Sequence, residues 1–345
     1  MAQLDPSVTA QLKQLAIAAG FSRVGVARAH SRPNDEARLR QWLSDGMHGE
    51  MAWLERDPAR RCDPAKVVDG AQSVIVLALD YDSATPTSQA NDLEGRGWIS
   101  RYALGMDYHK VAERRLKRLT EAVTTKIVPG LGAQWRQAAG LPETFNPARE
   151  FRWSVDYGPV LERQWAQEAG LGWQGKHSLL VDPHRGSYFF LATVITTLPL
   201  IADTPQLDHC GSCTACMDAC PTDAIVKERV VDARKCISYL TIEKRGELSE
   251  EQANALGDHI FGCDICQEVC PFNRFSEPSE VDELAPVEGR VAPRLADLMA
   301  LDAEGFAAAF RGSAVKRAKL HGLLRNVAAV QTNQRRQQAR ASEAD

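Results

Sequence analysis

Apolar and polar positions follow two different periods in the first two hundred residues. Apolar runs at 21–28 and 73–81 predict β-strands, and the second run is continuous enough to predict a strand buried on both faces. Apolar residues three and four positions apart predict amphipathic helices at 108–123 and 158–171. The longest apolar stretch, 187–202, predicts a buried pair of strands. Helices alternating with buried strands favour a layered α/β (α+β) domain.

The length of the chain predicts more than one domain. At 345 residues, with 44% hydrophobic and 25% charged residues, it has the size and composition of an ordinary globular protein with several parts. We expect an α/β domain over 1–202, a cysteine-rich domain over 203–280 and a helical region over 281–345. Two or three short helices are expected in the last part, and its final dozen polar residues are expected to fray.

Eight of the nine cysteines lie between positions 210 and 270. The first run reads C-x2-C-x2-C-x3-C-P, and the second reads C-x2-C-x3-C-P and ends at Cys270 and Pro271. In bacterial two-cluster ferredoxins, three close cysteines hold one cluster, and the fourth, before proline, ligates the other. The spacing therefore predicts a ferredoxin-like domain with two 4Fe-4S clusters.

The crossing pattern divides these cysteines into two sets. One cluster is assigned Cys210, Cys213, Cys216 and Cys270, and the other Cys220, Cys263 and Cys266. Since Ile260 occupies the position that would complete a regular second run, Cys236 is the candidate for the missing ligand, and Cys62 is left over as a buried apolar residue. Zinc sites usually use two separated C-x2-C pairs, and disulfide frameworks suit small secreted chains, so both alternatives are disfavoured.

Motifs for other cofactors are weak. The G-x-G-x-x-G spacing at 170–175 follows a predicted helix instead of a strand, which disfavours a Rossmann nicotinamide site, and there is no Walker lysine motif. Asp107 and His109 form a D-x-H, the start of a cobalt-binding loop in some cobalamin enzymes, but the glycine that should follow is missing. We interpret His109 as a residue at the start of a helix.

Asp156 is the candidate acid. It follows a predicted strand and precedes Gly158-Pro159, so its carboxyl group is expected at a strand end, where sites of α/β proteins form. A carboxyl group in a partly apolar place can donate a proton to a reacting group. The alternative is that Asp156 is only the N-cap of the helix that follows.

Basic residues gather near the C-terminus although the formal net charge of the chain is −4. Residues 305–342 contain no Asp or Glu, and the basic side chains between 311 and 340 form either a solvated helix face or a surface for phosphate groups. The N-terminus does not resemble an export signal, and thiolate ligands suit a reducing compartment, so we expect a cytoplasmic protein. The stretch 187–202 is too short to span a bilayer, and no membrane association is expected.

Five segments together resemble the epoxyqueuosine reductase family, whose members are cobalamin- and iron–sulfur-dependent tRNA modification enzymes. They are CGSCTACMDACPTDAI, GCDICQEVCPFN, SRYALGMDYHKV, VDYGPVLERQWAQEAGLGWQGKHSLL and GLLRN. The resemblance extends from about residue 15 to 333 and places Cys236 in the second cluster. It implies that residues 1–202 form a cobalamin- and substrate-binding domain.

The resemblance also implies an activity, its cofactors and its site residues. The expected reaction, the last step of queuosine biosynthesis, reduces epoxyqueuosine to queuosine at the tRNA wobble position, with base-off cobalamin. Asp156 matches the proton donor, and Lys244 matches a tRNA contact that we expect to act with Arg245 and the basic stretch. The implied cobalamin contacts are Arg61, Ser100, Asp156, His177, Ser238, Asp264 and Ile265, although His177 stands where the family usually has asparagine.

Two alternatives stay open at this point. A reductive dehalogenase would share cobalamin and two clusters but usually carries a twin-arginine export signal, whereas Arg60-Arg61 is internal here. A plain ferredoxin-type electron-transfer protein would need neither the cobalamin-like first half nor Asp156. The expected partners are a queuosine-family tRNA and an unidentified reductant protein, and the chain is expected to be a monomer.

Overall fold

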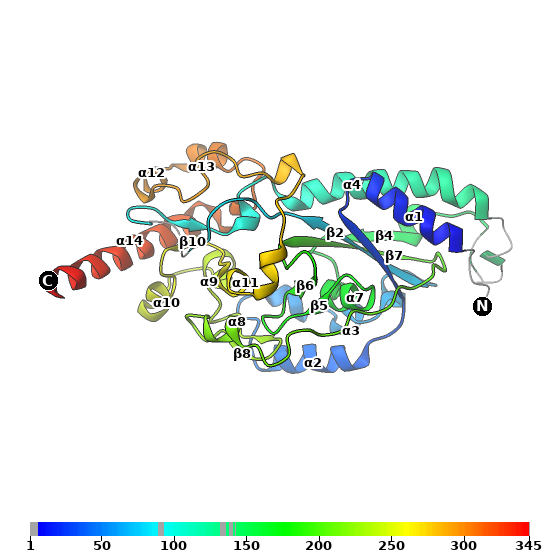
Figure 1. The fold of residues 1–345 in the computed structure, drawn as a ribbon, viewed down its shortest axis with the longest axis horizontal. Coiled ribbons are helices and arrows are strands. Elements are labelled where there is room, and N and C mark those ends of the chain that lie inside the picture. The colour runs from blue at the N-terminus through cyan, green and yellow to red at the C-terminus, as the bar shows by residue number, and fades with distance from the viewer. Residues whose placement is uncertain (1–5, 89–92, 132–135, 138–140, 142, 345) are drawn as a thin grey trace.

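A four-stranded antiparallel sheet lies at the centre of the N-terminal part of the chain (Figure 1). The computed structural model describes residues 6–88, 93–131, 136–137, 141 and 143–344. The strands follow the order β1-β2-β7-β4, and each neighbouring pair is antiparallel. Their bounds are β1 Arg23–Arg28, β2 Ser73–Asp80, β4 Phe151–Ser154 and β7 Phe189–Thr196.

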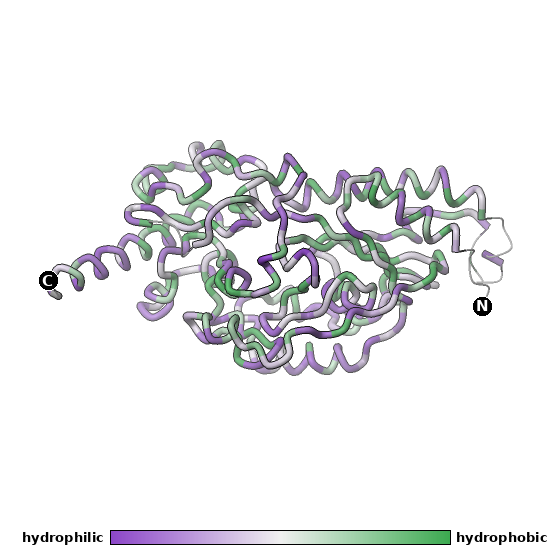
Figure 2. The backbone as a smooth tube through the Cα atoms, viewed as in Figure 1, coloured by the Kyte–Doolittle hydropathy of each residue, from purple (hydrophilic) through white to green (hydrophobic). Residues whose placement is uncertain are grey.

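Both faces of the central strand β2 are covered. Ile75 and Leu77 pack against helices α1 and α4, whereas Val74 and Val76 point the opposite way and pack against α7. Figure 2 shows this apolar interior between helices with polar outer faces. The helical elements of this part are α1 Pro6–Ala18, α2 Pro33–Ser44, η1 Ala52–Glu55, α3 Pro58–Arg61, η2 Pro64–Lys66, η4 Arg101–Ala103, α4 Tyr108–Ala122, η5 Val123–Ile127, η6 Val128–Leu131, α6 Pro147–Glu150 and α7 Glu162–Glu168.

Helix α7 approaches β1 closely. A Cβ atom at Gly25 would lie 2.1 Å from the carbonyl oxygen of Ala169, so only glycine leaves room for the chain at the end of α7. A short hairpin follows, formed by β5 Trp173–Gln174 and β6 Leu180–Val181. The hairpin and α7 therefore lie on the same side of the sheet, opposite α1 and α4.

The expected elements are largely present, with two differences. The strands at 21–28 and 73–81 and the helix at 108–123 are confirmed. The helix predicted over 158–171 starts only at Glu162, because the preceding residues form a loop whose Asp156 N–H bonds to the Glu162 side chain. The stretch 187–202 forms one strand, not two: beyond Thr196, backbone groups of residues 197–200 bond to Glu150, the Thr196 hydroxyl and Ser73.

The cysteine-rich segment consists of short elements joined by loops. Its strand β10 pairs in parallel with β3 of the first part. The bounds are β3 Trp98–Ile99, α8 Ala215–Asp218, β8 Ile225–Lys227, β9 Val230–Val231, α9 Ile237–Ile242, α10 Glu250–Ala255, β10 His259–Phe261, α11 Ile265–Glu268, η7 Pro271–Phe275 and η8 Asp282–Leu284. The segment between the two cysteine runs contains the β8–β9 hairpin followed by α9.

The C-terminal region ends in a long helix. Its elements are α12 Leu295–Met299, α13 Ala303–Ala309, η9 Ala314–Ala318 and α14 Lys319–Ala344. The expectation that the final dozen residues fray is wrong, because α14 continues to Ala344 through a sequence rich in the strong helix formers Ala, Gln and Arg. In Figure 1 this helix extends to the end of the molecule opposite α1.

The motif GLLRN anchors α14 to the cysteine-rich segment. Asn326, which is 0% exposed, donates from Nδ2 to the carbonyl oxygens of Thr241 and Ile260, both at 2.9 Å. Arg325 donates to the carbonyl oxygens of Leu240 at 2.7 Å and Gly246 at 2.7 Å. Both residues therefore hold the backbone that follows Cys236.

One hydrophobic core joins all three parts of the chain. It contains Ile99 and Leu104 from the first part, Phe261 from the cysteine-rich segment, and Leu298 and Val327 from the C-terminal region. The three segments thus pack as one body. Within the described residues, no helix has the length and apolar character needed to cross a membrane.

Candidate functional site

Four of the predicted cluster ligands form one group of neighbouring thiols. Burial raises the pKa of Cys216 to about 11, and the nearby thiols of Cys210, Cys270 and Cys213 contribute to this rise. The pKa of Cys270 is raised by burial and, in turn, by Cys210 and Cys213. The structure therefore brings together Cys210, Cys213, Cys216 and Cys270, although Cys270 is distant in sequence.

The other four thiols form a second group. Burial raises the pKa of Cys263, and Cys236 and Cys220 raise it further. Burial also raises the pKa of Cys266 well above its usual value, and the contributing thiols are Cys263, Cys236, Cys220 and Cys216. Because Cys216 belongs to the first group, the two groups adjoin at this point. Cys236 lies with the second group.

The surroundings of the sulfur atoms suit thiolate ligands. The Ala224 N–H donates to Cys220 Sγ at 3.3 Å, and the indole Nε1 of Trp173 donates to Cys210 Sγ at 3.3 Å. Backbone N–H groups of Ser238 and Tyr239 oppose the burial that raises the pKa of Cys236. Four thiols in each group, with N–H donors directed at the sulfur, fit the ligand set of a 4Fe-4S cluster. Cys62 is 1% exposed and takes part in neither group.

Asp156 lies in a loop just beyond strand β4. Its backbone has φ 61°, in the left-handed region that a non-glycine residue rarely adopts, and its N–H donates to Glu162 Oε1 at 3.0 Å. Its side chain is 68% exposed, so the expected apolar surroundings are absent. Asp156 is not a helix N-cap either, because α7 begins at Glu162 and Leu161 holds the capping position. The strand-end position is confirmed.

Two neighbours of Asp156 were missed by the sequence analysis. The Tyr108 hydroxyl donates to Asp156 Oδ2 at 2.8 Å, and its ring is stacked on Phe190, with centroids 4.1 Å apart. Burial, assisted by Asp156, raises the pKa of Tyr108 well above its usual value, which keeps the hydroxyl a donor. Burial and then the Asp156 charge likewise raise the pKa of Glu162. The sequence signal for Tyr108 was its place beside His109 in the D-x-H motif.

His109 is a helix-start residue, as interpreted. Asp107 is the N-cap of α4, and its Oδ1 accepts from the His109 backbone N–H at 3.1 Å. The imidazole Nδ1 lies 2.8 Å from the same carboxylate, and Nε2 lies 4.0 Å from Asp156 Oδ2. The ring therefore lies between two carboxylates.

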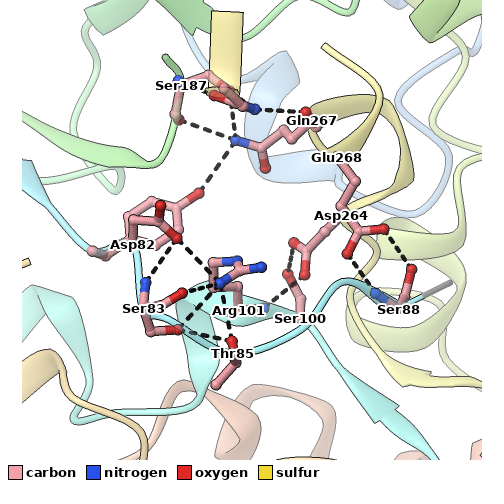
Figure 3. A network of polar contacts seen from close by, with 12 residues as sticks. Asp82, Ser83, Thr85, Ser88, Ser100, Arg101, Ser187, Asp264, Gln267 and Glu268 are labelled. Carbon is pink, nitrogen blue, oxygen red and sulfur yellow. Dashed lines mark hydrogen bonds and ion pairs between the residues drawn. The ribbon is translucent and has the colours of Figure 1, made fainter. Parts of the chain in front are cut away.

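Asp264 and Ser100 lie together in the interior between the first part and the cysteine-rich segment. Asp264 Oδ1 accepts from Ser100 Oγ at 2.5 Å, and Oδ2 accepts from the Arg101 N–H at 2.7 Å and from Trp98 Nε1 at 3.3 Å. Figure 3 shows the surrounding network, in which Glu268 bonds to Ser88, and Arg101 reaches the loop that follows β2. The polar atoms of both side chains thus already make hydrogen bonds within the protein.

Of the remaining predicted cofactor contacts, Ser238 and Ile265 lie beside the second thiol group, Arg61 contacts the Asp156 loop, and His177 lies in the turn between β5 and β6. Arg61 donates to the carbonyl oxygens of Gly158 at 3.2 Å and Trp53 at 3.1 Å, while its buried Nε has no hydrogen-bond partner among the described residues. His177 Nδ1 accepts from the Leu179 N–H at 3.1 Å, so Nε2 carries the proton, and this buried Nε2–H finds no partner in the part of the chain that the structure describes. Ser238 and Ile265 are half-buried in α9 and α11, the helices that follow Cys236 and Cys263.

A basic surface lies beside α9. It consists of Lys244, Arg245 and Arg317, because Arg245 Nη2 donates to the Arg317 carbonyl oxygen at 3.3 Å. Lys244 Nζ is 2.7 Å from Glu50, and Arg317 forms a two-point ion pair with Glu243. Arg325 does not belong to this surface, because backbone carbonyl groups occupy its guanidinium. Part of the basic stretch 311–340 therefore stabilises the fold through bonds to backbone carbonyl groups.

Comparison with known proteins identifies the family to which this chain is similar. Residues 209–273 match the 4Fe-4S double cluster binding domain, and residues 61–137 match the family described as Epoxyqueuosine reductase QueG, DUF1730. The chain is 42% identical to the epoxyqueuosine reductase of Cellulophaga algicola over 316 residues, covering 92% of this chain and 95% of the relative. It is 39% identical to that of Escherichia coli over 328 residues, covering 94% of this chain and 81% of the relative.

Solved structures with a similar fold point to the same family. The fold is similar to a crystal structure of epoxyqueuosine reductase with a tRNA-Tyr epoxyqueuosine-modified tRNA stem loop, with a TM-score of 0.81 and 28% identity over 95% of this chain and 82% of that chain. The enzyme from Bacillus subtilis gives the same TM-score of 0.81, identity of 28% and coverage of 95% and 82%. The chain is therefore an oxidoreductase that belongs to the epoxyqueuosine reductase family and carries a 4Fe-4S double cluster domain.

Proposed function

We propose that this chain reduces epoxyqueuosine to queuosine at the wobble position of a tRNA anticodon, the last step of queuosine biosynthesis, with Asp156 as proton donor. The observation that carries the proposal is the position of Asp156 relative to the second thiol group. Asp156 accepts a hydrogen bond from Tyr108, whose ring centroid lies 6.1 Å from that of Tyr102. The Tyr102 ring in turn lies 6.1 Å from that of Phe261, two residues before the ligand Cys263. An exposed acid thus lies near buried redox ligands.

The reaction defines what the site must supply. Two electrons and two protons convert the epoxide to an alkene and release its oxygen as water. A carboxyl group that protonates the departing oxygen stabilises the negative charge that develops there. The first proton comes from Asp156 and the second from solvent, which reaches this exposed side chain.

The chain's own residues are suited to hold the cofactors. The first thiol group would hold one 4Fe-4S cluster and the second group the other, each able to carry one electron. The buried N–H groups of Arg61 and His177, which have no partner within the described residues, fit the amide carbonyl groups at the rim of a corrin, which supports cobalamin as the further cofactor. Bound base-off, cobalamin supplies a strongly reducing metal centre. Of the proposed contacts, Asp264 and Ile265 directly follow the ligand Cys263, and Ser238 lies two residues after the ligand Cys236.

The residues around Asp156 orient its carboxyl group. Tyr108 holds Oδ2 and leaves Oδ1 for the substrate, and Glu162 fixes the backbone of Asp156 in its left-handed conformation. After the proton leaves, the Tyr108 hydroxyl stabilises the carboxylate that remains. The structure of the Bacillus subtilis relative is described as having its catalytic aspartate loop swung out of the active site, which supports a catalytic role for an aspartate on a loop.

The substrate side of the proposal rests on the basic surface. Lys244, Arg245 and Arg317 would contact phosphates of the anticodon stem-loop, which makes binding salt-dependent. A relative was solved with such a stem loop bound. The proposed division is a cobalamin- and substrate-binding domain over 1–202, a ferredoxin-like domain over 203–280 and an RNA-contacting region over 281–345. We further propose a cytoplasmic monomer that receives electrons from a separate reductant protein.

An Asp156→Asn variant tests the function directly. Single turnover on an epoxyqueuosine-containing anticodon stem-loop, scored by nucleoside mass, should slow by about 10²–10⁴-fold, the usual contribution of a general acid. Iron and cobalamin content should stay unchanged, since Asn keeps the size of the side chain. The matched control is Asp297→Asn, an exposed acid on α12, which should turn over normally. Turnover of Asp156→Asn near the parental rate would exclude the proton-donor role.

A further inference from the structure

Two large aromatic side chains remain exposed beside Asp156. Trp53 is 38% exposed and Tyr157 is 57% exposed, although aromatic rings of this size are usually mostly buried. Tyr157 is the residue next to Asp156. Trp53 belongs to the short helix η1, far away in sequence.

Arg61 brings these two aromatic residues to the same place. One guanidinium donates to the carbonyl oxygen of Trp53 at 3.1 Å and to that of Gly158 at 3.2 Å. The backbone of η1 is therefore held against the loop that carries Asp156 and Tyr157. A displacement of η1 would therefore also displace this loop through the Arg61 side chain, and the reverse holds as well.

Both rings are fixed by their neighbours while part of each stays open. The Arg317 guanidinium lies 5.1 Å from the centroid of the Trp53 ring, and Glu243 holds Arg317 with two hydrogen bonds of 2.9 Å. The Tyr157 ring is stacked on His109 at 5.9 Å and 22°, and its hydroxyl donates to Glu113 at 3.1 Å. Rings that are already ordered lose little entropy when a flat ligand stacks on them.

The charges around the rings favour a nucleic acid. Arg317 adjoins Arg245, and Lys244 follows the same helix α9, so cationic groups border Trp53. Aromatic faces bordered by cationic groups are the usual means of binding unstacked bases of single-stranded RNA.

We propose that Trp53 and Tyr157 are stacking residues that receive unstacked bases of the anticodon loop next to Asp156. The inference rests on the proposed function and deepens it, since it names the residues that hold the loop open. The modified base must leave its stack to reach the acid, and its neighbours lose stacking partners at the same time. The two exposed rings, one on each side of Arg61, offer these bases new stacking partners. Such stacking does not depend on the base sequence.

The test is equilibrium binding of an anticodon stem-loop to the cluster-loaded chain. Trp53→Ala and Tyr157→Ala should each raise the Kd by about 5- to 150-fold, which corresponds to ~1–3 kcal/mol for one base stacked on an aromatic ring. Trp53→Phe and Tyr157→Phe should recover most of the affinity, because a ring face is retained. The slope of log Kd against log salt should not change, since no phosphate contact is lost.

A matched control separates stacking at this site from a general loss of surface aromatics. Phe275 is 42% exposed and has the Arg274 guanidinium 4.6 Å from its ring centroid, like Trp53 with Arg317. Phe275→Ala should bind the stem-loop like the parent. Kd values within twofold of the parent for both alanine variants would overturn this inference but not the proposed function. An equal loss of affinity in Phe275→Ala would do the same.

The identity of the stacked ligand is tested in parallel. Cobalamin affinity, measured by absorbance titration, should be unchanged in Trp53→Ala and Tyr157→Ala. Loss of cobalamin affinity with RNA affinity retained would show that the rings hold the corrin, and would overturn the inference while leaving the proposed reaction intact. A parent chain that bound no stem-loop at all would overturn the proposed function and the inference with it.

Discussion

Replacing Asn326 by Ala removes a fully buried link between the C-terminal helix and the cysteine-rich segment. Its side-chain nitrogen donates 2.9 Å hydrogen bonds to the carbonyl oxygens of both Thr241 and Ile260, in a position with 0% exposure. The backbone of Thr241 belongs to α9, which begins directly after Cys236, and Ile260 is the middle residue of β10. The change therefore acts on the support of the second thiol group.

The expected magnitude follows from these two acceptors. A buried acceptor left without its partner costs ~1–3 kcal/mol, so two of them lower the free energy of unfolding by about 2–6 kcal/mol. Arg325 loses its two bonds to Asn326 Oδ1 but keeps three backbone carbonyl acceptors, so its contribution to the loss is small.

Urea unfolding of the cluster-loaded chain under anaerobic conditions measures this loss. Helical circular dichroism and iron–sulfur absorbance should both shift to lower urea, with the slope of free energy against urea unchanged. The matched control is Gln337→Ala, an exposed amide on the same helix, for which a change within about 0.5 kcal/mol is expected. A loss for Asn326→Ala no larger than that of the control would refute the reasoning.

Two further predictions concern titration and positioning. Burial and then the Arg163 charge lower the pKa of His177 from 6.5 to about 4, so between these values the unfolded chain binds a proton that the folded chain does not. Stability should therefore fall as the pH drops from 6.5 to 4, by about 2–4 kcal/mol, and His177→Asn should remove this part of the pH dependence of the unfolding free energy. An unchanged profile in His177→Asn would contradict this assignment. Glu162→Ala should slow single turnover by about 5- to 150-fold with cofactor content retained, because the Asp156 N–H loses its acceptor, whereas Glu162→Gln keeps an acceptor oxygen and should turn over much faster. Equal rates for the two Glu162 variants would argue against positioning through this bond.

Local patterns predicted the elements and the thiol grouping, because these depend on residues close in sequence or on a regular spacing. The continuous apolar run of β2 correctly indicated burial on both faces. Such a run is typical of parallel sheets, yet every pair in this sheet is antiparallel. The run is apolar on both faces because helices cover both faces of the sheet. Periodicity alone reports burial, whereas strand direction depends on the connections.

The site shows where sequence patterns carry less information. Asp156 could be placed at a strand end, but its exposure and its bond to Tyr108 arise from the fold of β4 against α4. Arg325 counted as one of several basic residues, yet its guanidinium is occupied by backbone carbonyl groups that follow Cys236. Charge in a sequence does not reveal whether a cation faces solvent or holds a buried backbone.

The core shared by the three parts of the chain limits how this enzyme can be dissected. Cutting out residues 203–280 would remove Phe261 from Ile99 and Val327, and would leave β10 without its partner strand β3. Such a fragment would expose apolar side chains and an unpaired strand edge, both of which promote aggregation. We therefore expect that the cysteine-rich segment does not fold as a separate ferredoxin. Its redox properties are best measured in the intact chain.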